Sequence, residues 1–231
     1  MKNAVILCLV FVLVVLFNSC SHVMYIPNTV NSTFLEEKGE LELSLYAQPM
    51  AYDFHAACAL TDKLAIMSNF TYGSAESSSE YKEINKRQFA EFGIGYIKKI
   101  RNFNIINCFL GFGKGSAEEQ KADKIAATGD YNRMFLQISG GFVKTGNFDL
   151  VSGLRICYLD FYNLMDGETK KKLDTFLIEP AITGRIGWQN LKVQMQCGFS
   201  FPLEKNVTDE IDYILPFIFA VGVNYRFHLF H

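Results

Sequence analysis

The stretch that most constrains the fold is residues 217–227, because it has two chemically different faces. Successive side chains of a β-strand point to opposite sides, so every second residue shares a face. One face is formed by Phe217, Phe219, Val221, Val223, Tyr225 and Phe227, and the other by Ala220, Gly222, Asn224 and Arg226. A strand of roughly 9–11 residues also crosses a bilayer. The pattern therefore fits both a buried sheet of a soluble protein and a lipid-facing strand of a membrane barrel.

The composition favours a single β domain. The chain has 231 residues, which suits one barrel or sandwich, and no change in composition marks a second domain. Aromatic residues make up 14% of the chain and there are 17 glycines, a mixture that suits strands and tight turns. The net charge is −2 and the Lys and Arg residues are scattered, so we expect no nucleic-acid partner.

The first residues have the form of an export signal. Lys2 precedes an apolar run over residues 4–17, which is shorter than the roughly 20 residues of a membrane-spanning helix. The run ends in LFNSC at residues 16–20, which resembles a bacterial lipoprotein signal. The resemblance implies cleavage before Cys20 and acylation of that residue. The alternative is an ordinary signal peptide in which Cys20 is incidental.

The cysteines beyond the leader do not form a recognisable site. They lie singly in separate strand-like segments, at Cys58, Cys108, Cys157 and Cys197, without the C-x-x-C spacing of zinc or redox sites. We expect small apolar packing residues, with disulfides in an oxidising compartment as the alternative. The sequence indicates no metal and no cofactor.

About ten segments alternate between apolar and polar residues, with turn-forming residues between them. They are residues 40–47, 52–59, 64–72, 88–97, 103–113, 131–143, 149–158, 176–186, 191–199 and 217–227. Pro180 cannot donate a ladder hydrogen bond, so we expect it at a rim or a bulge. Residues 1–19 are assigned to the signal peptide, 20–39 to a lipid-anchored tether, and 40–231 to the β domain.

The connections between these segments alternate in length. The short ones are residues 60–63, 98–102, 144–148 and 187–190, and the long, charged ones are 73–87, 114–130, 159–175 and 200–216. Only the first connection on the long side, residues 48–51, is short. This sorting is typical of an outer-membrane barrel, with short periplasmic turns and long external loops. The pattern predicts an all-β, antiparallel, up-and-down transmembrane barrel of about ten strands, with eight as the alternative. An even strand count would put both termini in the periplasm.

The mature chain as a whole resembles the small outer-membrane β-barrel proteins found widely in Bacteroidota. The motifs are the EEKGE run at residues 36–40 and the terminal NYRF at 224–227. A terminal aromatic residue in such a strand resembles the signal read by barrel-assembly machinery. The candidates for this signal are Tyr225, Phe227 and Phe230. The resemblance implies outer-membrane lipid and the assembly machinery as partners, with a surface ligand or envelope partner unidentified.

The inward faces of the predicted strands carry many charged residues. They are Glu42, Asp53, His55, Glu91, Arg155, Glu179, Arg185, Lys192 and Arg226. Buried charges must pair, so the sequence predicts a salt-bridge lattice, with a solute-selective passage as the alternative. Side chains fill a lumen of eight strands and ten add little room, so we expect no wide pore. Asp53 and His55 could act as a general base, but no nucleophile lies near them in sequence.

These patterns predict an outer-membrane barrel lipoprotein without catalytic activity. Its role would be structural, or surface interaction through the long external loops. One alternative is a soluble lipocalin-like or β-sandwich binding module, anchored by a lipid on Cys20. The other is a barrel that conducts a solute through a narrow lumen.

Overall fold

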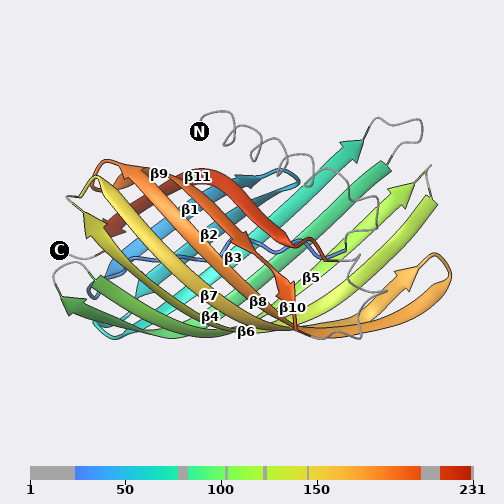
Figure 1. Cartoon of the computed structure of the whole chain (residues 1–231), viewed down its shortest axis with the longest axis horizontal. Coiled ribbons are helices and arrows are strands. Elements are labelled where there is room, and N and C mark those ends of the chain that lie inside the picture. Colours follow the sequence, from blue (N-terminus) through green and yellow to red (C-terminus); the bar gives the residue numbers. More distant parts are fainter. Residues whose placement is uncertain are drawn as a thin grey trace, which may run out of the picture.

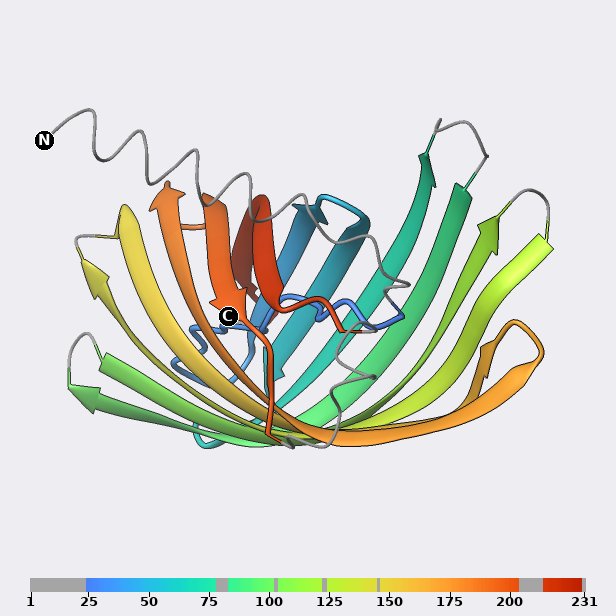
Figure 2. The ribbon, with the colours of Figure 1, turned by 45° about the vertical axis from the view of Figure 1, so that its right-hand side comes forward.

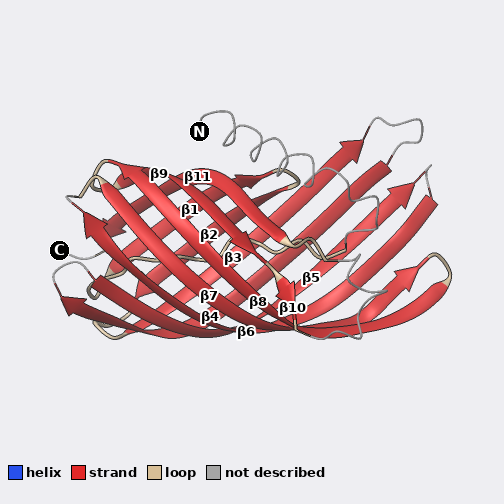
Figure 3. Ribbon diagram, viewed as in Figure 1, coloured by secondary structure: helices blue, strands red, loops and turns tan. Residues whose placement is uncertain are grey.

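The computed structural model describes residues 24–77, 83–101, 104–121, 124–144, 146–203 and 214–229. Within these ranges every regular element is a β-strand (Figure 3). No helix in the described part of the chain is long and apolar enough to span a membrane.

Ten long strands and one short one make up a single antiparallel sheet. They are β1 (Glu40–Gln48), β2 (Ala51–Ala59), β3 (Leu64–Ser77), β4 (Glu83–Arg101), β5 (Asn104–Lys121), β6 (Lys124–Lys144), β7 (Phe148–Asp166), β8 (Thr169–Gly187), β9 (Leu191–Phe199), β10 (Phe201–Pro202) and β11 (Phe217–His228). Neighbours in sequence pair from β1 to β9, β9 also pairs with β11, and β11 pairs with β1. These pairings close the sheet into an up-and-down barrel. The predicted fold class and the count of ten are confirmed, and the alternative of eight strands is wrong.

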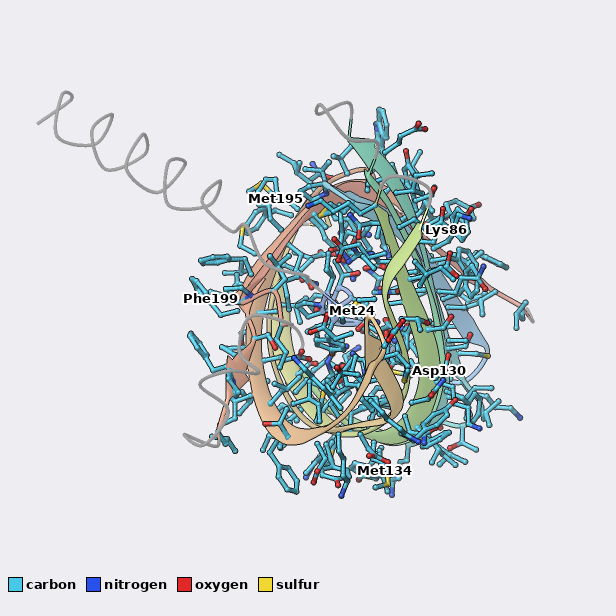
Figure 4. The ribbon with its side chains drawn as sticks, turned by 90° about the vertical axis from the view of Figure 1, so that its right-hand side faces the viewer. Met24, Lys86, Asp130, Met134, Met195 and Phe199 are labelled. Carbon is cyan, nitrogen blue, oxygen red and sulfur yellow. The ribbon has the colours of Figure 1, made fainter. Side chains whose placement is uncertain are left out.

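The outer surface of the barrel is an apolar belt. In register across four strands, Ile94, Leu110, Leu136 and Ile156 form one row of this belt. Leu110 is 62% exposed and Val193 on the opposite side of the barrel is 61% exposed. Figure 4 shows Met134, Met195 and Phe199 pointing outward from the ribbon.

The inner face has the opposite chemistry. On β11, Phe219, Val221 and Tyr225 face outward, whereas Ala220 and Asn224 are buried. The same alternation holds on β9, whose polar residues are buried and whose apolar residues are exposed. The two faces predicted for residues 217–227 are therefore present, with the apolar face outward.

Three hairpins extend well beyond the belt, which corrects the expectation of long loops. β5 to β8 are 18, 21, 19 and 19 residues long, whereas β1, β2 and β9 have nine residues each. The belt ends at a polar row formed by Lys114, Asn132, Asp160 and Asp174. Beyond this row the β3–β4, β5–β6 and β7–β8 hairpins form what we call the hairpin wall (Figure 2).

Most of the residues expected in external loops at 73–87, 114–130 and 159–175 are therefore strand residues. In two of the three hairpins, and where these two meet, the pairing shifts register within the wall, at Glu119/Gln120, Asp130/Tyr131 and Phe161/Leu164, whereas β3 and β4 pair without a shift. Such bulges interrupt the period of two on which the prediction depended. The fourth expected loop spans 200–216, of which residues 204–213 lie outside the described part.

Pro180 lies in the middle of β8, opposite Leu154 of β7, so the expectation of a rim or bulge is wrong. On the other side of β8, the pairing with β9 ends at Ala181 and Gly198, and pairing with β10 begins at Ile178. A proline is tolerated here because its missing N–H coincides with this interruption of the ladder.

Residues 24–35, which we call the lumen segment, lie inside the barrel. All of them are buried. Figure 1 shows this blue segment running lengthwise between the walls of the barrel, and Figure 4 shows Met24 near the centre when the barrel is viewed end-on. The expected tether over residues 20–39 therefore contains a buried stretch, residues 24–35, which occupies the lumen.

Inward-facing glycines make room for aromatic rings beside this segment. A Cβ atom on Gly111 would lie 2.3 Å from Cζ of Phe135, and one on Gly115 would lie 2.3 Å from Cζ of Tyr131. Distances this short require the ring to move, so a side chain is excluded at these positions. By contrast, a Cβ on Gly184 would have no atom within 4 Å.

We therefore expect Gly111→Ala to destabilise the barrel by about 1–3 kcal/mol, the usual cost of overpacking. Gly184→Ala is the matched control, and we expect its free energy of unfolding to stay within about 0.5 kcal/mol of the parent. The measurement is equilibrium unfolding in urea of the protein folded into vesicles. Equal stabilities for the two variants would contradict the packing of Phe135 against Gly111.

Candidate functional site

The candidate site is the lumen, where the barrel holds the lumen segment by its main chain. Every residue from Asn28 to Phe34 has a main-chain atom hydrogen-bonded to a barrel side chain. Arg155 donates to the carbonyl of Asn28, Gln137 to that of Asn31, Arg185 to that of Ser32, Asn107 to that of Thr33 and Arg226 to that of Phe34; Asp53 accepts from the N–H of Thr29 and Glu42 from that of Phe34. The segment is therefore bound as an extended peptide.

Gln196 makes the most complete of these contacts. Its Oε1 accepts from the N–H of Val30 at 2.6 Å, and its Nε2 donates to the carbonyl of the same residue at 2.9 Å. Val30 itself is fully buried and packs with Ala181 and Ile218. The amide thus replaces the strand neighbour that this residue lacks, because a buried main-chain group needs a partner.

Side chains of the segment add further contacts at the end nearer the hairpin wall. The hydroxyl of Tyr25 accepts from Arg133 at 2.7 Å and donates to Glu179 at 3.2 Å. The ring of Tyr25 meets that of Tyr131 edge-on, with 5.7 Å between centroids. Asn28 donates to Glu91 at 3.2 Å. The lumen segment therefore contacts charged side chains of the inner face as well as neutral amide side chains.

The predicted inward charges lie in the lumen, and all but Asp53 and His55 form three groups of ion pairs. In the first group, Arg155 lies 2.6 Å from Glu179 and 3.7 Å from Glu91, and Glu91 also pairs with Arg133. In the second, Arg185 lies 2.8 Å from Glu42. An unpaired buried charge costs several kcal/mol, so each pair compensates the burial of its members.

A fourth acid, Asp149, forms the third group with the two remaining predicted cations. Asp149 lies 2.5 Å from Lys192 and 3.7 Å from Arg226. Sequence reasoning missed both Asp149 and Arg133 as members of these pairs. The signal was present, because Asp149 is in phase with Arg155 on one strand and Arg133 with Tyr131 on another.

Asp53 and His55 meet through a residue of the lumen segment. The hydroxyl of Thr29 lies 3.1 Å from Nε2 of His55 and donates to Asp53 at 2.6 Å. Asp53 also accepts from Gln48. Thr29 and Asp53 are fully buried and His55 is 2% exposed, so a substrate has no access to the hydroxyl. These contacts fix the segment in place and do not form a nucleophile–base pair with an open site.

At the opposite end of the lumen the chain enters β1 through a small polar cluster. One ligand atom each from Glu37, Glu40 and His228 lies within 4.8 Å of the others, a grouping that could hold a metal ion. The Glu40 carboxylate already accepts from the N–H groups of Glu36 and Glu37. Nε2 of His228 lies 3.5 Å from the same carboxylate, so Glu40 joins the start of the first strand to the end of the last.

The remaining predicted residues concern anchoring and assembly. Tyr225 lies on the outer face of β11 and its ring is 5.4 Å from that of Phe227. Cys20 and Phe230 lie outside the described residues. The lipid anchor and the assembly signal therefore stay predictions.

One concavity lies on the outer polar face of the hairpin wall. Its volume is about 330 Å³, and charged residues of both signs line it, including Lys86, Glu118 and Asp130. Asn163 of the next strand donates to Asp130 at 3.0 Å. Figure 4 shows Lys86 and Asp130 on the outside of the ribbon, away from the lumen.

No protein-family model matches the chain, and no curated protein sequence matches it. Solved structures of outer-membrane barrels are loosely similar. The N-terminal barrel domain of Pseudomonas aeruginosa OprF has 9% identity and a TM-score of 0.42, covering 82% of this chain and 98% of that one. The translocator domain of the autotransporter NalP from Neisseria meningitidis has 14% identity and a TM-score of 0.44, covering 81% and 86%. The KdgM porin has 12% identity and a TM-score of 0.40, covering 82% and 99%. At these TM-scores the likeness carries no conclusion about function.

We expect Arg155→Ala to destabilise the folded barrel by about 3–5 kcal/mol, because it leaves Glu179 buried without its closest cation. Lys172→Ala is the matched control, since Lys172 pairs with Asp174 at 3.6 Å on the exposed wall. Its loss should cost less than about 1 kcal/mol. Both values follow from equilibrium unfolding in vesicles, and a near-neutral Arg155→Ala would contradict the pairing described for the lumen.

Proposed function

We propose that the chain is a bacterial outer-membrane barrel, anchored by a lipid on Cys20, with a structural or surface-interaction role and a lumen closed by its own N-terminal segment. The observation that carries this proposal is the polarity of the barrel. Large apolar side chains such as Leu110 and Val193 are more than half exposed, whereas Arg155 and Glu179 are fully buried. Such an arrangement suits lipid outside and protein inside.

The same polarity argues against the soluble alternatives. A lipocalin-like barrel or a sandwich buries its apolar residues and exposes its charges. Here the apolar belt continues around the barrel, from Phe92 on β4 to Val223 on β11. An exposed apolar surface of this kind marks a membrane or partner interface.

The filled lumen argues against the conducting alternative. The lumen segment is buried throughout and its main chain is bound at every residue from Asn28 to Phe34. A barrel of ten strands has little spare room, and here a peptide occupies it. We therefore infer that the resting protein does not conduct solutes freely.

The hairpin wall supplies the surface for interaction in place of the expected loops. Outer-membrane barrels have short periplasmic turns and project their longer connections outward. We infer that the wall end faces outward and that the end with the short turns, which we call the turn end, faces the periplasm together with Leu229. The mixed charges around Lys86 and Asp130 would then meet an envelope or extracellular partner.

We expect the protein to fractionate with outer membranes, to resist extraction by high salt and to migrate faster on a gel when unheated than when boiled. The reason is that a closed apolar-belted barrel keeps its shape in detergent until heat opens it. A boiled sample supplies the unfolded reference. Release by high salt alone would rule out the membrane placement.

We expect the purified wild-type barrel to be silent in planar bilayers, because the lumen segment closes it. A variant lacking residues 24–35 should show ion conductance, provided that its heat-modifiable migration proves that it folds. If that variant does not fold, the recording of the wild-type protein alone still tests whether the lumen is closed. Steady conductance by the wild-type protein would contradict a closed lumen.

A further inference from the structure

The lumen segment runs along the barrel axis from the wall end to the turn end. At its beginning, Tyr25 forms a parallel bridge with Ile214, and the N–H of Leu215 donates to the carbonyl of Tyr25 at 2.9 Å. These partners directly precede β11, at the end of that strand where Phe217 pairs with Phe199. The segment therefore begins at the wall end.

The other end of the N-terminal stretch lies at the turn end. The N–H of Lys38 donates to Asp62 in the turn between β2 and β3, at 3.1 Å. The N–H of Gly39 donates to the carbonyl of Ala59 at 2.9 Å, and the N–H of Leu229 donates to the carbonyl of Gly39 at 2.8 Å. The chain has thus passed through the whole lumen before β1 begins beside the end of β11.

The levels of the contacts show that the segment crosses the full height of the belt. Tyr25 binds Arg133, whose neighbour Met134 lies in the last apolar row below the wall. Phe34 lies close to Gly141, since a Cβ there would be 2.8 Å from its Cζ, and Gly141 pairs with Ile105 at the turn end. A belt of this type is about 25 Å tall.

Covalent reach then limits where the preceding residues can go. Cys20 is four residues before Met24, and an extended chain spans at most about 3.6 Å per residue, or roughly 14 Å in all. This reach is shorter than the height of the belt. The lumen, through which the chain could return to the turn end, is already filled by the lumen segment. Cys20 itself lies outside the described residues, and only its separation of four residues from Met24 limits its position.

We propose that the chain ahead of Met24 opens on the wall side of the membrane, so that an acyl group on Cys20 inserts into the wall-side leaflet, opposite the C-terminal end of β11. The proposal rests on the membrane placement proposed above. It differs from the expectation that both termini lie on the periplasmic side. The even strand count does place the start of β1 beside the end of β11, where Glu40 pairs with His228. The lumen segment, however, crosses the belt once more before β1 begins.

Thiol labelling in cells tests the proposal directly. Ser21→Cys reports the side of the N-terminus, Lys170→Cys marks the wall end and Lys38→Cys marks the turn end. A maleimide that cannot cross membranes is applied to intact cells and to cells with opened outer membranes. The parent chain gives the background, because its described cysteines face the belt or are buried. Heat-modifiable migration confirms that each variant folds, and His22→Cys serves as a second reporter.

We expect Ser21→Cys and His22→Cys to label in the same preparation, and to the same extent, as Lys170→Cys. Labelling together with Lys38→Cys, or in neither preparation, would overturn the proposal. Equal labelling of the two markers Lys170→Cys and Lys38→Cys in intact cells would instead contradict the membrane placement, and the proposal with it. The two failures are therefore distinguishable.

Discussion

An extended peptide without strand neighbours must find partners for its N–H and C=O groups, and this constraint shapes the interior of the barrel. Residues 28–34 are held by amide, guanidinium and carboxylate side chains from the inner face, with Gln196 bonded to both main-chain groups of Val30. Because Arg155 and Arg185 are buried to reach carbonyls, they need acids beside them, which Glu179 and Glu42 provide. The charges of the lumen and the presence of the segment therefore depend on each other.

Much of the barrel could be predicted because apolar and polar residues alternate strictly where one face of a strand forms the belt and the other faces the lumen. Residues 191–199 and 217–227 show this pattern throughout and were placed with the correct faces. The wall could not be predicted in the same way. Its outer face is largely polar and its register shifts at Asp130/Tyr131 and Phe161/Leu164, so alternation fails while the backbone pairing continues.

The site was harder to predict than the fold. Alternation shows that Arg155 and Glu179 point inward, but which charges pair depends on the cross-strand register, which one sequence does not reveal. Residues 24–35 have no hydrophobic period because they form no strand, and their many polar residues suit a solvated linker equally well. Their burial follows from long-range contacts such as that between Asn28 and Glu91, which are 63 residues apart.

Among the strands that the structure describes, the sheet closes on itself in the belt but not in the hairpin wall. Within the belt every long strand has two neighbours, because β1 pairs with β11 and β8 pairs with β9. Among the described strands, β3 pairs only with β4 beyond Tyr72. Before Leu177, β8 pairs only with β7, apart from the N–H of Leu203, which donates to the carbonyl of Phe176. The edge of a sheet can pair with a further strand. Among the described strands, the same sheet is thus closed on itself in the belt, whereas in the wall β3 and β8 are edge strands beside which a further strand could pair.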